Sequence, residues 1–187
     1  MNLTVEDLKK LQETLQEKQL DYQLELVDGN IVVMGLSDYI SEVIVARLIF
    51  LLQSWILPRQ LGYVTGSSAG FRLPNGNLRG PDVSFVSAAR LNPLPRSFAE
   101  IVPDLMVEVK SATDRIQPLE NKILMFLSLG TQVGLLIDPD ELSMRVYRAG
   151  NEPIVMTSND TLTIPELFPG WELSISEIWP QVFGCGD

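Results

Sequence analysis

The sequence contains no histidine and only one cysteine, Cys185, among its 187 residues. The lack of histidine excludes a Ser-His-Asp or Cys-His catalytic group, a histidine general base and a zinc site built on imidazole. A single cysteine excludes a disulfide framework and any metal site made of several thiolates. A reducing compartment fits such a chain best, so we expect a cytoplasmic protein.

A long uninterrupted hydrophobic run is also missing. The most apolar stretch, residues 43–56, is about 14 residues long and contains Arg47 and Gln53, whereas a membrane-spanning helix needs roughly 20 apolar residues. The first 20 residues are charged and amphipathic, unlike an export signal, in which a basic segment precedes an apolar one. We therefore expect no membrane segment, and we interpret residues 43–56 as a buried helix.

The overall composition is that of an ordered globular domain. Hydrophobic residues make up 45% of the chain and charged residues 20%, which excludes a long disordered protein. The length is sufficient to bury a substantial core. Because no repeat, low-complexity tract or linker interrupts the sequence, we predict a single domain over residues 1–187.

Hydrophobic spacing predicts helices alternating with groups of strands. The expected helices cover residues 5–18, 39–55 and 118–129. The expected strands form a hairpin over 22–34 and then lie at 63–73, 81–87, 105–110, 133–138, 142–147, 154–156 and 161–164. This order of elements predicts an α/β or α+β fold in which helices cover the faces of a sheet.

Two of the predicted strands carry the residues that suggest chemistry. Side chains alternate along a strand, so Glu108 and Lys110 should share one face while Val107 and Val109 face the core. Two residues along a strand span about 6.6 Å. Asp82 stands at the start of another short strand, directly after Pro81. Charged groups on an otherwise apolar strand are costly to bury, which favours a functional role for them.

Carboxylates from two neighbouring strands form a site that suits a hard divalent cation. Asp82 and Glu108 would bind Mg²⁺ or Mn²⁺, and the backbone carbonyl of Val109 would supply a third oxygen ligand. A lysine beside this site, Lys110, would orient a water molecule or stabilise developing negative charge. A metal and a lysine together can hydrolyse a phosphodiester without histidine.

These segments resemble a known nuclease family. Pro81-Asp82 followed by Glu108-Val109-Lys110 is similar to the signature of the PD-(D/E)XK nuclease superfamily. A longer ordered set, within about residues 22–175, resembles the Uma-type restriction endonuclease family. Its pieces are Glu25-Leu26-Val27-Asp28-Gly29, Pro81-Asp82-Val83-Ser84-Phe85-Val86, Pro103-Asp104-Leu105-Met106-Val107-Glu108-Val109 with Ser111 and Asp114, Lys122, and Leu136-Ile137-Asp138-Pro139.

The resemblance implies a restriction-endonuclease-like α/β fold, with a central mixed sheet flanked by helices and an extra N-terminal helix and strands. It implies a Mg²⁺- or Mn²⁺-dependent endonuclease that hydrolyses phosphodiester bonds in DNA. It also implies a homodimer, because cutting both strands of a duplex needs two sites. The apolar C-terminal segment with Trp171 and Trp179 is the surface we expect to pair the subunits.

The resemblance also assigns roles to individual residues. Asp82 and Glu108 would be metal ligands, and Lys110 would be the catalytic lysine. Many relatives carry this lysine on the following helix instead, where Lys122 stands, so both lysines remain candidates. Glu25 matches an acidic position of the family. Related nucleases often add a glutamate from the first core helix, and Glu42 is our candidate for it.

The charge distribution leaves alternatives open. The net charge is −10, and residues 47–122, with nine basic and six acidic side chains, form the one basic region. Its arginines are candidate phosphate contacts, namely Arg72, Arg79, Arg90, Arg96 and Arg115. The second interpretation is that they neutralise nearby carboxylates, and an acidic chain should bind DNA weakly. The alternatives are an inactive nuclease-fold protein used for binding or assembly, and a hydrolase of small phosphorylated molecules.

Overall fold

A six-stranded mixed sheet forms the centre of the computed structural model, which describes residues 2–181. Its strand order is β10-β9-β8-β7-β6-β3. Strands β7 and β8 are parallel and the other neighbouring pairs are antiparallel. The strands are β3 (Gly62–Gly66), β6 (Val83–Ser87), β7 (Leu105–Val109), β8 (Val133–Asp138), β9 (Ser143–Arg148) and β10 (Ile154–Thr157).

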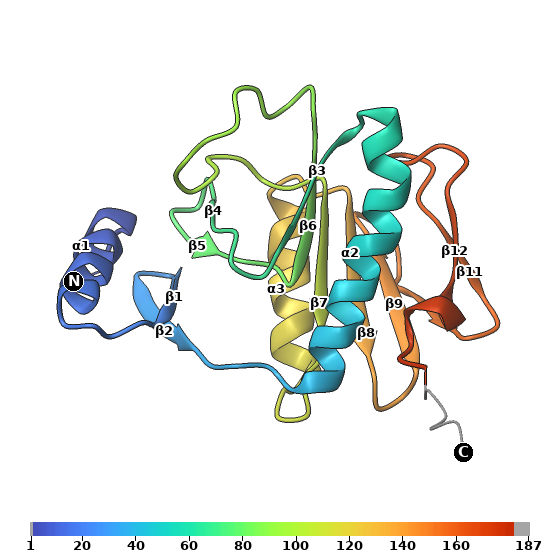
Figure 1. Ribbon diagram of the computed structural model, residues 1–187, viewed down its shortest axis with the longest axis horizontal. Coiled ribbons are helices and arrows are strands. Elements are labelled where there is room, and N and C mark those ends of the chain that lie inside the picture. Colours follow the sequence, from blue (N-terminus) through green and yellow to red (C-terminus); the bar gives the residue numbers. More distant parts are fainter. Residues whose placement is uncertain (1, 182–187) are drawn as a thin grey trace, which may run out of the picture.

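Two helices cover opposite faces of this sheet (Figure 1). Helix α2 (Tyr39–Arg59) packs on one face, and α3 (Ile116–Ser128), which connects the parallel strands β7 and β8, packs on the other. The alternation predicted for β7 is confirmed. Val107 and Val109 lie in the cluster with α2, whereas Met106 packs with α3 and Glu108 contacts Lys122 of that helix.

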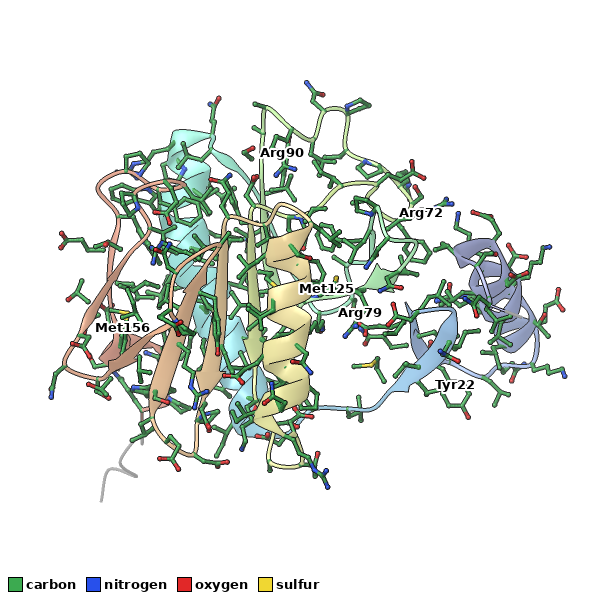
Figure 2. All side chains as sticks on the ribbon, turned by 180° about the vertical axis from the view of Figure 1, so that it is seen from behind. Tyr22, Arg72, Arg79, Arg90, Met125 and Met156 are labelled. Atoms are coloured by element: carbon green, nitrogen blue, oxygen red, sulfur yellow. The ribbon has the colours of Figure 1, made fainter. Side chains whose placement is uncertain are left out.

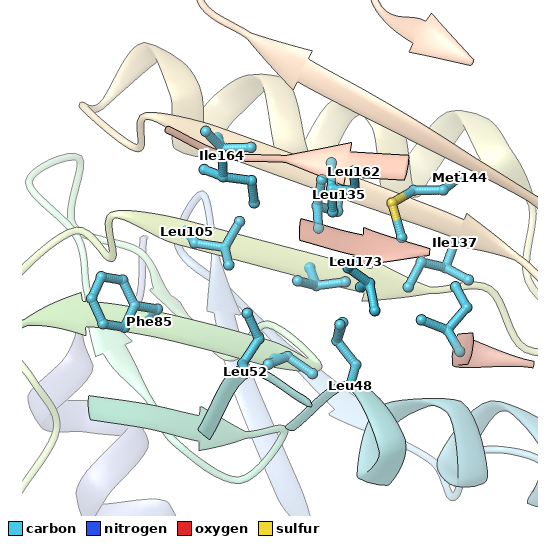
Figure 3. Packing of buried hydrophobic residues seen from close by; sticks show 14 of the residues in the cluster. Leu48, Leu52, Phe85, Leu105, Leu135, Ile137, Met144, Leu162, Ile164 and Leu173 are labelled. Atoms are coloured by element: carbon cyan, nitrogen blue, oxygen red, sulfur yellow. The ribbon is translucent and has the colours of Figure 1, made fainter. Parts of the chain in front are cut away.

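The main hydrophobic core lies between the sheet and α2 (Figure 3). Leu48 and Leu52 of α2 contact a cluster that includes Leu105 and Leu135, and all four are almost fully buried. Each such side chain contributes about 1.5–3 kcal/mol by leaving water. The fold is thus a central mixed sheet flanked by helices, as the sequence predicted.

The C-terminal segment covers the rest of this core and corrects one expectation. It contains β11 (Thr161–Thr163), β12 (Glu172–Ser174) and the short 3₁₀ helix η1 (Ile175–Ile178). Trp171 is 5% exposed within the core, and Trp179 is half-buried against it. Both tryptophans are therefore used inside the protomer, and the prediction that they form an exposed dimer surface is wrong. Cys185 lies outside the described residues.

Among residues 2–181, α2 is the helix whose length and mean hydropathy would allow it to cross a membrane. Core helices of soluble proteins pass the same test. Its buried residues Ile44, Leu48, Leu52 and Ile56 face the sheet, which is the packing of a core helix.

A smaller lobe beside the main sheet contains the predicted extra N-terminal helix and strands, together with two short strands that follow β3. Its elements are α1 (Val5–Glu17), β1 (Gln23–Val27), β2 (Asn30–Met34), β4 (Phe71–Arg72) and β5 (Leu78–Arg79). The strands form a separate sheet in the order β2-β1-β5-β4. Leu24 and Leu26 of β1 pack with Leu8 of α1, while Glu25 between them points to the opposite side. This lobe therefore delivers one carboxylate toward α3.

Candidate functional site

A cleft of about 610 Å³ opens at the end of β7, bordered by β1, the start of α2 and α3. Five carboxylate side chains line it, and Lys122 is the basic residue among its described lining residues. The carboxylates are those of Glu25, Glu42, Asp82, Glu108 and Asp114. All the acidic residues predicted as site candidates thus meet at one place.

The ion pair between Glu108 and Lys122 lies at the base of the cleft. Both side chains are buried, and Lys122 Nζ lies 2.8 Å from Glu108 Oε1 and 2.9 Å from Oε2. The ammonium donates a hydrogen bond to Oε2 and another, of 2.9 Å, to the carbonyl oxygen of Gly80. Oε1 is out of line for a hydrogen bond and has no other partner. Lys122 is therefore fixed directly against the carboxylate of Glu108.

Burial dominates the electrostatics of this pair. Burial raises the pKa of Glu108 to about 8, opposed by the charge of Lys122 and reinforced by that of Asp82. Burial lowers the pKa of Lys122, but the carboxylates of Glu108 and Glu25 outweigh it, so the pKa of Lys122 rises. The ammonium thus stays charged, and an additional cation would favour the ionised form of Glu108.

Glu25 extends the ion pair into a buried network. Its Oε1 accepts a hydrogen bond of 2.8 Å from the backbone N–H of Gly80 and lies 3.6 Å from Lys122 Nζ. Its Oε2 lies 2.7 Å from Nε of Arg79 on β5. Glu25 therefore links the N-terminal lobe to α3. The network also borders a second cavity of about 510 Å³ beneath β2, so it is reached from two sides.

Asp82 approaches Glu108 from the neighbouring strand. It directly precedes β6, and its Oδ2 accepts a hydrogen bond of 2.7 Å from the backbone N–H of Val109. Burial raises the pKa of Asp82, and the nearby charges of Glu42 and Asp114 add to this rise. Val109 lines the cleft although its side chain lies in the main core. The two carboxylates therefore line the same cleft, as the sequence predicted, whereas the contact seen at Val109 is made by its N–H and not by the carbonyl oxygen expected as a ligand.

Lys110 does not join this group, which corrects the expectation that it shares a face with Glu108. Strand β7 ends at Val109, so the alternation that would place Lys110 beside Glu108 stops one residue too early. Its ammonium pairs instead with Asp140 in the β8–β9 turn and lies 3.9 Å from Asp138. Lys122, from the helix, is the lysine that the fold brings to Glu108.

The loop after β7 is attached to the first turn of α2. Asp38 caps that helix by accepting hydrogen bonds from the backbone N–H groups of Ile40 and Ser41, and it accepts a third, of 3.0 Å, from the backbone of Ala112. These bonds lower the pKa of Asp38. Nothing in the sequence indicated the contact between Asp38 and residue 112, which attaches the loop after β7 to the helix turn that carries Glu42.

Three of the five arginines proposed as phosphate contacts are paired with carboxylates. Arg72 lies 3.3 Å from Glu6, Arg79 is buried against Glu25, and Arg90 pairs with Asp104. Figure 2 shows Arg79 between α3 and the β1–β2 hairpin, well away from Arg90. The interpretation that arginines neutralise nearby acids is therefore correct for these three.

The residues present fit a magnesium-type cation. Within residues 2–181, no three acidic or cysteine side chains gather into a ligand set of their own. Mg²⁺ commonly uses one or two protein carboxylates and fills its remaining positions with water and substrate phosphate. Asp82 and Glu108 are such a pair, and the buried Oε1 of Glu108 lacks a hydrogen bond. A cation would have to share Glu108 with Lys122.

Comparison with known proteins identifies the fold and the family of this chain. No curated protein matches the sequence at a significant level. The fold is similar to that of "a putative nuclease belonging to DUF820 from Anabaena variabilis", with a TM-score of 0.80 and 22% identity over 94% of this chain and 97% of that chain. A family model described as "Putative restriction endonuclease" matches residues 5–176. The chain therefore belongs to this family, named Uma2.

Proposed function

We propose that this protein is a metal-dependent endonuclease that hydrolyses phosphodiester bonds in DNA. The observation that carries the proposal is the convergence of Asp82 and Glu108 on one cleft, with the ammonium of Lys122 2.8 Å from Glu108. Family membership supports the nuclease class. The metal is proposed from the chemistry of these residues, and the DNA substrate from the resemblance to restriction endonucleases.

In this proposal Asp82, Glu108 and the carbonyl of Val109 hold Mg²⁺ or Mn²⁺. The cation, when bound, supplies charge neutralisation at the phosphate and a water molecule of lowered pKa. Lys122 holds its proton beside Glu108 and places positive charge next to the scissile phosphate. Glu25 acts on Lys122, since its carboxylate lies 3.6 Å from the ammonium and restrains it.

The two remaining candidate residues, Glu42 and Lys110, lie at different positions. Glu42 lies on the exposed first turn of α2 and lines the cleft, where it can position a water molecule or a second cation. Lys110 is directed toward Asp138 and Asp140, so we assign the lysine role to Lys122.

We also propose that the protein is cytoplasmic and has no membrane segment. We further propose that it acts as a homodimer, because a duplex has two strands to cut. Because Trp171 is buried in the core and Trp179 is half-buried against it, these two rings offer little free surface for pairing subunits. Light scattering combined with gel filtration measures the mass in solution and tests this part directly.

One observation favours the second candidate, an inactive nuclease-fold protein used for binding or assembly. The carboxylate of Glu108 is already neutralised by Lys122, and the cleft has five carboxylates that repel a polyanion. In that case the buried network would serve only to join the N-terminal lobe to α3.

Metal titration and cleavage separate these candidates. We expect Mg²⁺ or Mn²⁺ to raise the melting temperature and to support nicking of plasmid DNA, and Asp82→Asn to abolish both effects. Arg59→Gln, on the far end of α2, is the matched control and should behave like the wild type. No shift and no nicking would support the inactive protein. Activity on nucleotides but not on DNA would support a hydrolase of small phosphorylated molecules.

A further inference from the structure

Apart from the cleft and the cavity beneath β2, an apolar cavity of about 490 Å³ lies beside the cleft, beneath the loop of residues 88–103. We call it the loop cavity. Tyr63 and Thr65 of β3 and Val86 of β6 line it from the sheet, and Phe71 and Phe98 line it from the sides. The loop runs between β6 and β7 and extends past the sheet above β4 (Figure 1). The site described above does not include this cavity.

The charges around the loop cavity are opposite to those of the cleft. No aspartate or glutamate is among its described lining residues, whereas Lys9 and Arg96 are. Lys9 lies 3.4 Å from Glu6 on the surface of α1, and Arg96 is exposed and forms no ion pair with a described residue. An anionic group is therefore attracted to this cavity and repelled from the cleft in the absence of a cation.

The two hollows meet at one short segment. Ser68, in the turn between β3 and β4, lines the loop cavity and also the cleft that contains Asp82 and Glu108. A chain molecule with a phosphate at these carboxylates can therefore extend along the cleft past Ser68 to the loop cavity.

The walls of the loop cavity suit a planar ring with polar edges. Tyr63 is 37% exposed, and Leu94 on the loop is 55% exposed, so apolar surface remains uncovered at the opening. Exposed apolar surface around a concave site commonly marks a binding site. Thr65, Ser68 and Ser97 contribute hydroxyl-bearing side chains to the lining, and Thr65 Oγ1 lies 2.6 Å from Oγ of Ser84, which is buried behind it. Aromatic and apolar walls, hydroxyls and basic rim residues together match a nucleobase and its neighbouring phosphate.

We propose that the loop cavity binds an unpaired nucleobase next to the bond that is cut in the cleft. This inference rests on the proposed nuclease function and names its substrate class: a single strand, or a duplex opened locally at the site. A base inside a duplex is stacked on both sides and must leave the stack to enter the cavity. Stacking on aromatic side chains stabilises a base that has done so.

The experiment compares three fluorescein-labelled 12-mers: an oligothymidylate strand, a duplex, and a strand with an abasic sugar at every position. Binding is measured by anisotropy in Ca²⁺, whose ionic radius and charge suit the same oxygen ligands as Mg²⁺. We expect the thymidylate strand to bind more tightly than both others. Tyr63→Leu and Phe98→Leu, which keep bulk but remove the ring, should weaken thymidylate binding by about 5- to 20-fold and leave abasic binding unchanged.

Matched variants and a folding control complete the test. Phe50→Leu removes an exposed ring on α2 that lines neither hollow, and it should bind like the wild type. Arg96→Gln should weaken the thymidylate and abasic strands equally, because it contacts phosphate. Tyr63 lies at an exposed position of an edge strand, so its variant remains informative if Phe98→Leu fails to fold. Equal binding of thymidylate and abasic strands, or preference for the duplex, would overturn the proposal.

Cleavage assays separate failure of this inference from failure of the nuclease function. If the wild type nicks plasmid DNA and Tyr63→Leu nicks it at the same rate, the base-binding role is overturned and the nuclease function is retained. Base-dependent strand binding without any Mg²⁺- or Mn²⁺-dependent cleavage would support the cavity assignment and reject catalysis.

Discussion

Two lysine–carboxylate pairs lie on either side of the end of β7, and their surroundings differ. Lys122 and Glu108 are 7% and 2% exposed, and further buried groups contact both. Lys110, whose side chain is 13% exposed, pairs with Asp140 of the β8–β9 turn, and the Asp140 side chain is 65% exposed and therefore open to water. The comparison shows that the same two residue types form a structural and chemical centre in one place and a surface contact in the other.

The difference follows from solvation. An exposed pair contributes about 0–1 kcal/mol, because water screens its attraction and the long side chains lose entropy. Removing one partner of a buried pair costs about 3–5 kcal/mol, because the other charge remains buried without compensation. The buried pair is therefore the one whose loss should be seen in both stability and activity.

The largest expected effect is that of replacing Lys122 with methionine, with the same replacement of Lys110 as the matched control. Lys122→Met should lower the rate of Mg²⁺-dependent plasmid nicking by about 10²-fold or more and destabilise the protein by about 3 kcal/mol. Lys110→Met should leave the rate within about threefold. Nicking rates and urea denaturation measure the two effects. Equal losses of rate in both variants would contradict the assignment of Lys122.

The buried network should respond strongly to replacement of Glu25. Glu25→Gln keeps the shape but removes a charge that restrains Lys122 and Arg79, so we expect a loss of about 1–3 kcal/mol in stability. If Glu25 positions Lys122, kcat should fall while KM stays near the wild-type value. Steady-state cleavage kinetics distinguish this from a general loss of folded protein, which circular dichroism would detect. A change in KM alone would contradict the positioning role.

The pH dependence of stability should also separate the two pairs. The pKa of Glu108 rises from 4.5 to about 8 in the fold, so the folded state binds this proton more tightly than the unfolded chain. The stability of metal-free protein should therefore fall as the pH rises from about 5 to 8. Glu108→Gln should flatten this slope, whereas Asp140→Asn should keep it. Melting temperatures measured over this pH range in a chelating buffer test the prediction. Equal slopes for the wild type and Glu108→Gln would contradict it.

A moderate effect is expected at the cap that holds the rim of the cleft. Asp38→Ala should destabilise the protein by about 1 kcal/mol at pH 7. The pKa of Asp38 is lowered in the fold, so its contribution is present above pH 4 and is lost as the pH falls through the folded pKa. The difference between variant and wild type should thus shrink at pH 3. Asp7→Ala, at the cap of α1, is a control that should leave cleavage unchanged.

The smallest effect should come from the exposed pair. Asp140→Asn should change stability by less than about 0.5 kcal/mol, and 0.5 M salt should remove the difference. Thermal denaturation at two salt concentrations measures this. A loss as large as that of Lys122→Met would contradict the distinction between buried and exposed pairs.

The sequence by itself determined the strands that carry the site. Alternation along residues 105–109 and the short strand after Pro81 predicted which side chains face the core, and the structure confirms this. The convergence of Asp82 and Glu108 was also predicted, because it depends on neighbouring strands of one sheet. Periodicity is a local property, so such features can be inferred from sequence.

The tertiary structure alone decided which lysine joins Glu108 and where the tryptophans lie. Lys110 is two residues from Glu108, but the strand ends at Val109 and the β8–β9 turn offers Lys110 other carboxylates. Lys122 is 14 residues away and reaches Glu108 because α3 packs on that face of the sheet. Such contacts depend on how distant elements dock and on the desolvation they impose, which local sequence patterns do not encode.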